Sequence, residues 1–425
     1  MKKNIWAVMI VLLLVAVVLA CCANRADAPV HPDEPVPSEE PTEPEHPEEP
    51  EQPEEPEQPE EPEEPEIPEE PEDPAEALLA RMTLRQKVGQ VFWIMPEQLV
   101  PGVTDSDMGE RSIEGAKSVT EDMKRTLEQY PAGGFVLFAR NIDTPDQLRT
   151  LTEGLRSACA VAPVMAVDEE GGRVARIAGN PAFGVANVGS MASLASSGDR
   201  ERVRTAAAEI GAYLAEYGFT FDLAPVADTN TNPDNVVIGD RSFGSDPETV
   251  ADMVGAYVEG LHSRGVRSTL KHFPGHGDTV ADSHKGTVTV NKTWAELLTA
   301  ELVPFIRNLD STDAVMVAHI NLPNITGDGL PATLSRELIR DRLRGELGYD
   351  GLVVTDSLAM GAVTGPYTPA QAAVLAFQAG NDVLLIPENY KEAFDGLLSA
   401  VESGEIPEER LDESVLRILR LKLGE

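Results

Sequence analysis

Residues 76–425 alternate between short apolar runs and longer stretches in which polar residues recur at helical spacing. Short β-branched apolar runs predict buried strands. Eight such runs occur, at Val88–Ile94, Gly134–Phe138, Val164–Val167, Thr220–Pro225, Ser268–His272, Ala314–His319, Leu352–Thr355 and Asp382–Ile386. The stretches between them predict helices, which include Glu201–Tyr217, Pro247–Arg264, Leu334–Leu347, Pro369–Ala379 and a closing helix over 407–425.

Buried strands interleaved with helices predict an α/β fold built on a parallel sheet. The strand count and the length favour a closed (β/α)8 TIM-type barrel, formed by a single domain over residues 76–425. A doubly wound open sheet is the structural alternative. Neither GxGxxG nor GxxxxGK[ST] follows the first predicted strand, so the sequence gives no support for nucleotide binding.

The first 20 residues have the pattern of an export signal. Met1, Lys2 and Lys3 form a short positive region, and an unbroken apolar run from Ile5 to Ala20 follows it. This run suits the core of a signal peptide better than a membrane span, because a span needs about 20 apolar residues. We therefore predict a signal peptide over residues 1–20.

The apolar run ends in Val18-Leu19-Ala20-Cys21, which resembles the lipobox of bacterial lipoproteins. The resemblance implies that Cys21 is lipidated, becomes the mature N-terminus and anchors the protein to a membrane. An uncleaved anchor helix that extends through Cys22 is the alternative. Both interpretations keep the N-terminal lysines inside and predict an extracytoplasmic protein of the cell envelope.

Residues 21–75 predict an extended linker, because they contain too few apolar residues to form a core. From Pro41 to Pro74 a proline falls at every third position, and glutamate fills most other places. Three residues per turn is the period of polyproline II, and repulsion between like charges keeps such a segment extended and disordered. A stalk that lifts the domain off a membrane and a solubilising linker both fit this composition.

The distribution of charge limits what the alternating region can bind. The chain has 72 acidic and 34 basic side chains, a net charge of −38, and 23 of the acids fall within residues 27–76. Residues 77–425 still hold 49 acids against 31 bases. Nucleic acid is excluded as a partner, because phosphate binding requires a basic face. The three cysteines are too few for a disulfide-stapled scaffold.

Chargeable side chains stand at the ends of several predicted strands. They are Asp168-Glu169-Glu170, Asp222 with Asp228, Lys271-His272, His319 and Asp356. The carboxyl ends of barrel strands meet at one mouth, so these residues are expected to form a common site. Carboxylates mixed with His and Arg suit sugar chemistry, in which hydroxyl groups need hydrogen-bond partners and cleavage needs paired acids.

The segment from Lys271 to His284 has the sequence KHFPGHGDTVADSH. Its proline and glycines end the strand and impose a loop, so His272 and His276 cannot share the helix face that a zinc site of this spacing needs. We predict no metal and no cofactor. Asp282 and His284 lie two positions apart, where the carboxylate can orient the imidazole for general acid and base catalysis.

KHFPGHG followed by DSH resembles the signature of the family 3 β-N-acetylglucosaminidases. The resemblance extends over residues 77–425, through GGFVLFARN at 133–141, VDEEGGRVAR at 167–176, FDLAPVADTN at 221–230, DRSFGSDP at 240–247, PATLS at 331–335 and LGYDGLVVTDSLAM at 347–360. The family implies a (β/α)8 barrel that hydrolyses terminal β-linked GlcNAc with retention of configuration. The implied substrate is a GlcNAc-terminated glycan or muropeptide, and we expect the protein to be a monomer.

The resemblance also implies roles for individual residues. Asp356 matches the catalytic nucleophile, and His284 matches the acid/base, with Asp282 as its orienting partner. Five further residues match positions that bind N-acetylglucosamine in the −1 subsite, namely Asp168, Arg176, Arg241, Lys271 and His272.

Two features depart from the family pattern. Glu169 stands where the family commonly has Gln, which adds one negative charge beside Asp168. Some relatives also carry a second domain that supplies an acid/base Glu. We expect none here, so the loop from Gly275 to Gly286 has to provide the acid.

Three other functions share parts of this pattern. A β-glucosidase would use the nucleophile Asp356 but would not need the pair Asp282 and His284. A phosphorolytic enzyme would use phosphate in place of water, since a neutral His repels phosphate less than Glu does. A non-catalytic sugar-binding lipoprotein would keep the barrel alone.

Overall fold

The computed structural model describes residues 73–103, 115–279, 286 and 288–424. The predicted signal peptide with Cys21, nearly all of the predicted linker, Asp282 and His284 lie outside the described residues. Contacts divide the chain into residues 1–67 and 68–425, and every described residue belongs to the second unit. Within the described ranges no helix is both long and apolar enough to cross a membrane.

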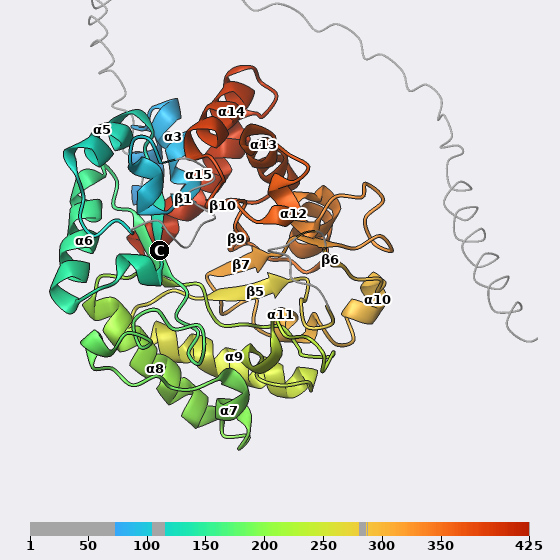
Figure 1. Cartoon of the computed structure of the whole chain (residues 1–425). Helices are drawn as coiled ribbons and strands as arrows, with labels where there is room; N and C mark the ends of the chain where they lie inside the picture. The colour runs from blue at the N-terminus through green and yellow to red at the C-terminus, as the bar shows by residue number, and fades with distance from the viewer. Residues whose placement is uncertain (1–72, 104–114, 280–285, 287, 425) are drawn as a thin grey trace, which may run out of the picture. The chain divides into compact units, whose positions relative to one another are not determined.

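Parallel strands form the centre of the described domain (Figure 1). A five-stranded sheet has the order β10-β1-β2-β3-β4, and a three-stranded sheet has the order β5-β7-β9. The strands are Phe92–Ile94 (β1), Gly134–Leu137 (β2), Val164–Val167 (β3), Phe221–Asp222 (β4), Thr269–Phe273 (β5), Ala314–Val317 (β7), Leu352–Thr355 (β9) and Leu384–Leu385 (β10). A smaller parallel sheet pairs Val288–Thr289 (β6) with Ile320–Asn321 (β8).

Isolated parallel bridges connect the two larger sheets at both of their edges. The bridged pairs are Phe221–Arg267 and Val226–Lys271 between β4 and β5, and Val354–Val383 between β9 and β10. Each edge strand of one sheet therefore lies beside an edge strand of the other. The predicted α/β fold with parallel sheets is confirmed.

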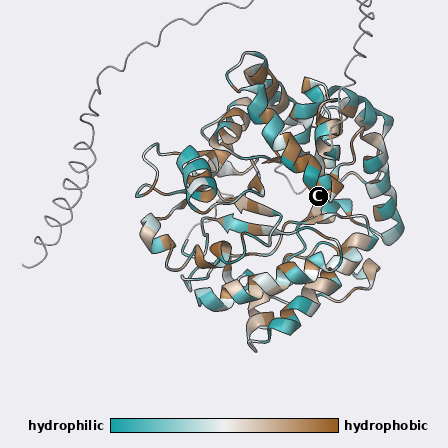
Figure 2. Cartoon of the chain, turned by 180° about the vertical axis from the view of Figure 1, so that it is seen from behind, coloured by the Kyte–Doolittle hydropathy of each residue, from teal (hydrophilic) through white to brown (hydrophobic). Residues whose placement is uncertain are grey.

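Helices surround the strands, with α5 and α6 on one side, α8 and α9 on another, and α13 and α14 on a third (Figure 1). The α-helices are Pro74–Leu79 (α2), Leu84–Gln90 (α3), Glu121–Gln129 (α5), Pro145–Ala158 (α6), Met191–Ala195 (α7), Arg200–Glu216 (α8), Pro247–His262 (α9), Trp294–Leu297 (α10), Val303–Ile306 (α11), Gly361–Thr364 (α12), Pro369–Ala379 (α13), Tyr390–Glu402 (α14) and Glu408–Leu423 (α15). The 3-10 turns are Pro96–Leu99 (η1), Ala139–Asn141 (η2), Pro181–Phe183 (η3), Gly239–Arg241 (η4) and Ala332–Leu334 (η5), and a π-helix spans Glu337–Glu346 (η6). The outer helices carry both hydrophilic and hydrophobic residues (Figure 2), as expected for helices with one buried face.

Capping residues explain where several helices begin. The side chain of Asp246 accepts a hydrogen bond from the backbone N–H of Thr249, and proline occupies the first position of α9. Thr368 and Gln371 form a reciprocal capping box at the start of α13. Both arrangements satisfy backbone donors that have no partner inside the helix, so the sequence determines these boundaries locally.

Four of the predicted elements were wrong in extent or type. The first predicted strand started at Val88, but Val88 lies on the buried face of α3, which begins at a capping box formed by Thr83 and Gln86. An apolar run on a buried helix face looks the same in sequence as a buried strand. Strands β4 and β10 contain only two residues each, and the predicted helix Leu334–Leu347 is a 3-10 turn followed by a π-helix.

Candidate functional site

The carboxyl ends of the central strands surround a cavity of about 580 Å³, which we call the strand-end cavity. Asp168 follows β3, and Asp356 follows β9. Six of the predicted site residues line the cavity, namely Asp168, Arg176, Arg241, Lys271, His272 and Asp356. The structure therefore brings together the predicted nucleophile and all five predicted sugar-binding residues, while Asp282 and His284 lie outside the described residues.

Lys271 is the centre of a network of ion pairs on one wall of the cavity. Its Nζ lies 2.8 Å from Oδ1 of Asp168 and 2.6 Å from Oε1 of Glu170. Glu170 also accepts two hydrogen bonds of 2.8 Å from the guanidinium of Arg241. The side chains of Lys271 and Glu170 are each only 2% exposed, so the network holds them rigidly at the wall.

The electrostatics of Glu170 follow from this network. Burial raises the pKa of its carboxyl, but Lys271 and Arg241 outweigh burial and hold that pKa well below its ordinary value. Glu170 was noted in the sequence only as part of an acidic run. Its position between two basic residues could have been anticipated because residues 168 and 170 share one face of an extended segment.

Glu169 does not lie in the strand-end cavity. Its carboxylate is fully buried and accepts hydrogen bonds from three consecutive backbone N–H groups, those of Arg176, Ile177 and Ala178, at 2.5, 2.9 and 2.9 Å. The hydroxyl of Tyr213 donates a fourth bond of 2.9 Å. The extra negative charge beside Asp168 in the sequence therefore does not face the strand-end cavity, and the Glu169 side chain instead fixes the loop that carries Arg176.

Arg176 reaches the cavity from that loop. Its guanidinium lies 3.8 Å from the carboxylate of Asp168 and 5.8 Å from the centre of the Phe138 ring. Asp168 therefore has a basic partner on each side, Arg176 and Lys271. Fixed donors and acceptors of this kind can bind the hydroxyl groups of a sugar without rearrangement.

Asp228 orients two histidines beside the cavity. Its carboxylate lies 2.7 Å from Nδ1 of His272 and accepts backbone hydrogen bonds from His272 and His276 at 3.2 and 2.7 Å. Burial raises the pKa of Asp228, but the two histidines outweigh burial and lower it below its ordinary value. A carboxylate at Nδ1 favours the tautomer that has its proton there, which leaves Nε2 of His272 as an acceptor.

Asp356 also lines the cavity, directly after β9. Its backbone N–H donates to the carbonyl of Val317 at 2.9 Å, and its Oδ1 accepts from the backbone N–H of Ser357 at 2.8 Å. His319 supports this turn from behind, because its Nε2 lies 2.8 Å from the carbonyl oxygen of Ser357. The backbone at Asp356 is therefore held from two sides, which fixes the direction of its carboxylate.

Besides Glu169 and Asp228, two more of the predicted strand-end residues do not line the cavity. Asp222 and His319 are both fully buried. Asp222 accepts a hydrogen bond from the backbone N–H of Glu169, and His319 lies 2.8 Å from the hydroxyl of Thr333. Both support the strand ends, so the expectation that they form part of a common mouth is wrong.

Among the described residues, no group of three His, Cys, Asp or Glu side chains is placed to hold a metal ion. The strand-end cavity instead combines carboxylates with Lys, Arg and His side chains. Such a set can bind a polyhydroxylated ligand and place a carboxylate at a fixed point beside it. A parallel α/β domain with this cavity at its strand ends has the features of an α/β glycoside hydrolase.

Comparison with known proteins identifies the family within that class. Residues 83–421 match the family described as "Glycosyl hydrolase family 3 N terminal domain". The chain belongs to glycosyl hydrolase family 3, and the family predicted from the sequence is confirmed.

Several relatives carry related names. The chain is 34% identical to beta-hexosaminidase A of Pseudoalteromonas piscicida over 328 residues, which cover 71% of this chain but only 55% of that protein. It is 36% identical to beta-hexosaminidase LpqI of Mycobacterium tuberculosis over 312 residues, which cover 71% of this chain and 78% of the relative. The chain thus spans about half the length of the first of these relatives.

A solved structure gives a closer likeness in sequence. The glycoside hydrolase family 3 β-N-acetylglucosaminidase from Paenibacillus sp. str. FPU-7 is 41% identical and superposes with a TM-score of 0.73. The comparison covers 80% of this chain and 62% of that structure.

Proposed function

We propose that the protein is a retaining exo-β-N-acetylglucosaminidase that removes terminal β-linked GlcNAc. The observation that carries this proposal is the position of Asp356 in the same cavity as Lys271, Asp168 and Arg176. A carboxylate that faces fixed sugar-binding groups is what a glycosyl-enzyme mechanism requires. The names of the two curated relatives and of the Paenibacillus structure support the choice of substrate.

Asp356 acts as the nucleophile in this proposal. Its carboxylate attacks C1 of the sugar while the bond from C1 to the leaving oxygen breaks, and His284 donates its proton to that oxygen. Water then attacks C1 of the glycosyl-enzyme and gives a proton to His284, which releases Asp356 with the configuration at C1 retained. Asp282 orients His284; both residues lie outside the described ranges, and their roles rest on the sequence.

Four of the remaining predicted residues bind the sugar, and the fifth, Arg241, supports them. Asp168 accepts hydrogen bonds from hydroxyl groups, while Lys271 and Arg176 donate to them. His272 offers Nε2 because Asp228 occupies Nδ1. Arg241 contacts Glu170, so its contribution is to hold the network that positions Lys271.

We also propose that the two parallel sheets together form a closed (β/α)8 barrel. The isolated bridges at both junctions of the sheets support closure, because they leave each edge strand beside a parallel neighbour. The short strands β4 and β10 account for the division into two sheets, since pairs of two residues contribute few ladder hydrogen bonds.

The proposed setting is the cell envelope, where Cys21 is lipidated and residues 21–75 hold the domain away from the membrane as a monomer. The natural substrate is then a GlcNAc-terminated wall glycan or muropeptide. Inhibition of the lipoprotein signal peptidase with globomycin tests the anchor. A precursor of higher mass should accumulate, and an unchanged mass would contradict lipidation.

The activity is tested with 4-nitrophenyl β-glycosides of GlcNAc and glucose. We expect kcat/KM to be much higher for the GlcNAc substrate, free GlcNAc as the product whether or not phosphate is present, and β-anomer first in a proton NMR time course. A preference for the glucoside, a sugar phosphate product or an initial α-anomer would each contradict part of the proposal. No turnover by the folded protein would support a sugar-binding role instead.

A further inference from the structure

A second cavity, of about 800 Å³, lies between η6, the end of α13 and the first half of α15. We call it the arginine cavity, because five arginines line it, namely Arg336, Arg340, Arg344, Arg410 and Arg417. It shares no lining residue with the strand-end cavity. The proposed hydrolysis therefore does not account for it.

One carboxylate forms ion pairs with three of these arginines. Asp382 is fully buried, and its oxygens lie 2.5 Å from Arg344, 3.3 Å from Arg417 and 3.8 Å from Arg410. A single negative charge cannot neutralise three guanidinium groups. The floor of the arginine cavity therefore has an excess of positive charge.

The buried Arg410 is held in place before any ligand arrives. Arg410 is only 9% exposed; its guanidinium donates to the hydroxyl of Ser414 at 2.6 Å and to the carbonyl of Asn381 at 2.9 Å. It also lies over the ring of Phe377, 4.6 Å from the centre. Burial, together with nearby guanidinium groups, lowers the pKa of Arg410 to about 10 despite Asp382, so a further anion would stabilise its charged form.

Arg340 supplies a positive charge that no carboxylate among the described residues neutralises. Within the described ranges no ion pair of 4.0 Å or less joins it to an acidic side chain. Its stem packs closely on Gly380, where an added Cβ would lie only 2.9 Å from Cγ of Arg340. Gly380 has a φ of +119°, so this close approach depends on glycine.

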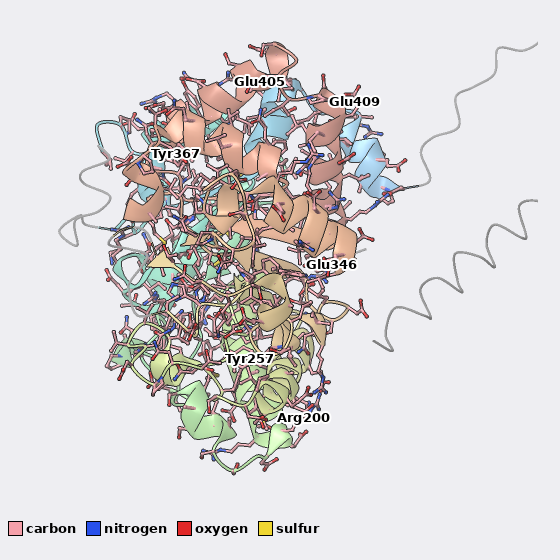
Figure 3. The ribbon with its side chains drawn as sticks, turned by 90° about the vertical axis from the view of Figure 1, so that its right-hand side faces the viewer. Arg200, Tyr257, Glu346, Tyr367, Glu405 and Glu409 are labelled. Carbon is pink, nitrogen blue, oxygen red and sulfur yellow. The ribbon has the colours of Figure 1, made fainter. Side chains whose placement is uncertain are left out.

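Exposed acidic side chains also line the cavity. Glu409 and Glu413 project from α15, line the cavity and are exposed, and no ion pair within 4.0 Å joins either of them to a basic side chain in the described part of the chain. Glu409 lies near the top of Figure 3, with Glu405 close to it in the view. Arg340 and these glutamates thus face one cavity but stand too far apart to pair directly.

We infer that the arginine cavity binds a small zwitterion, an amino acid or the end of a short peptide, with its carboxylate on Arg340 and its ammonium toward Glu409 and Glu413. A ligand with both charges bridges the gap that keeps the protein's own charges apart. A polyanion is disfavoured by the exposed glutamates, and a simple cation is disfavoured by the arginine floor. Apolar side chains from Leu334, Leu375 and Ile406 complete the walls and can contact a small side chain of the ligand.

The dipeptide Ala-Ala and its blocked forms test the inference on the full chain. Isothermal titration should show binding of Ala-Ala, weaker binding of N-acetyl-Ala-Ala and of Ala-Ala amide, and none of the doubly blocked N-acetyl amide. GlcNAc in excess should not displace Ala-Ala. Equal affinity for all four forms, or displacement by GlcNAc, would contradict the inference.

Variants on η6 locate the site. Arg340→Gln should raise the dissociation constant of Ala-Ala about tenfold or more, because a charge-assisted hydrogen bond is lost. Arg342→Gln is the matched control: Arg342 lies on the same helix but pairs with Glu346 and Glu337 outside the cavity. Glu413→Gln should reduce the preference of Ala-Ala over its N-acetyl form. Equal loss of binding in Arg340→Gln and Arg342→Gln, or no loss in either, would overturn the assignment; melting temperatures show that each variant is folded.

Discussion

The strand-end cavity and the arginine cavity use charge in different ways. In the first, Lys271 lies between two carboxylates, and Arg241 pairs with one of them. In the second, three arginines share Asp382, and Arg340 pairs with no described carboxylate. Where positive and negative side chains are paired, as in the strand-end cavity, their hydrogen-bonding groups can bind a neutral, hydroxylated ligand such as GlcNAc. Where positive side chains outnumber their carboxylate partners, as around Asp382, a charged ligand is favoured.

The largest expected effect comes from removing the proposed nucleophile of the strand-end cavity. The ion pairs among its other charged residues stay in place. Asp356→Ala should lower kcat on 4-nitrophenyl β-GlcNAc by roughly 10³-fold or more, because it removes the nucleophile. Asp350→Ala, an exposed residue that precedes the same strand, is the control. Near-normal kcat in a folded Asp356→Ala protein would remove Asp356 from the mechanism.

The next effect concerns stability in the arginine cavity. Asp382→Asn leaves Arg344, Arg410 and Arg417 without their shared carboxylate, so the free energy of unfolding should fall by about 3–5 kcal/mol. Asp328→Asn, on the edge of the same cavity, should change it by less than about 0.5 kcal/mol. Urea denaturation measures both. Similar small losses in the two variants would show that Asp382 does not hold the arginines.

A pH series tests whether a buried carboxylate paired with basic residues also stabilises the fold at the strand-end cavity. The pKa of Glu170 is lowered in the folded protein, so its contribution to stability is present above its ordinary pKa and is lost as pH falls toward the folded value. Glu170→Gln should therefore cost about 2–3 kcal/mol near pH 7 and progressively less below about pH 4. The exposed Glu128→Gln provides the control.

Urea denaturation of both Glu170 and Glu128 variants from pH 7 to pH 3 gives the required free energies. A cost of Glu170→Gln that stays constant over this range would show that Lys271 and Arg241 do not stabilise its ionised form. If the loss of unfolding free energy in Glu170→Gln became larger as the pH fell, the result would contradict the lowered pKa of Glu170.

How much the sequence could predict depends on the kind of interaction involved. The strands at Val164–Val167 and Leu352–Thr355 were predicted with the bounds that the structure shows, because short β-branched runs bounded by polar residues have few alternatives. The first predicted strand failed at Val88, where the capping box at Thr83 starts a helix instead. The capping residues therefore determine that Val88 lies in a helix, which the pattern of apolar residues alone could not distinguish from a strand.

The site shows a similar limit. Asp168 and Lys271 were predicted correctly to meet, since Asp168 follows β3, Lys271 lies near the end of β5, and the carboxyl ends of such strands were expected at one mouth. The effect of Glu169 was left open, although adjacent residues in an extended segment point to opposite sides, so its position next to Asp168 already implied that it faces away from the cavity. The arginine cavity could not have been predicted, because Arg340 on η6 and Arg410 on α15 are far apart in the sequence and come to one cavity only in the folded chain. Asp282 and His284 remain predictions.

The smallest expected effect comes from a change that alters how His272 is oriented but leaves the ion pairs of Lys271 intact. Asp228→Asn places an amide where a carboxylate now faces Nδ1 of His272. The preferred tautomer of His272 is then lost, and Nε2 no longer serves as a fixed acceptor for the sugar. We expect kcat/KM for the GlcNAc substrate to fall about tenfold, mainly through KM, since one hydrogen bond of the bound sugar is weakened.

The control for this effect is Asp234→Asn, which changes an exposed carboxylate in the segment that follows Asp228. Kinetics over pH 5–8 separate orientation from general damage: a positioning role changes KM and its pH dependence while the melting temperature of the variant stays close to that of the wild type. A loss confined to kcat would assign Asp228 to the chemical step instead. Unchanged KM in folded Asp228→Asn would mean that the His272 tautomer does not matter for sugar binding, and that the balanced ion pairs around Lys271 hold the substrate without it.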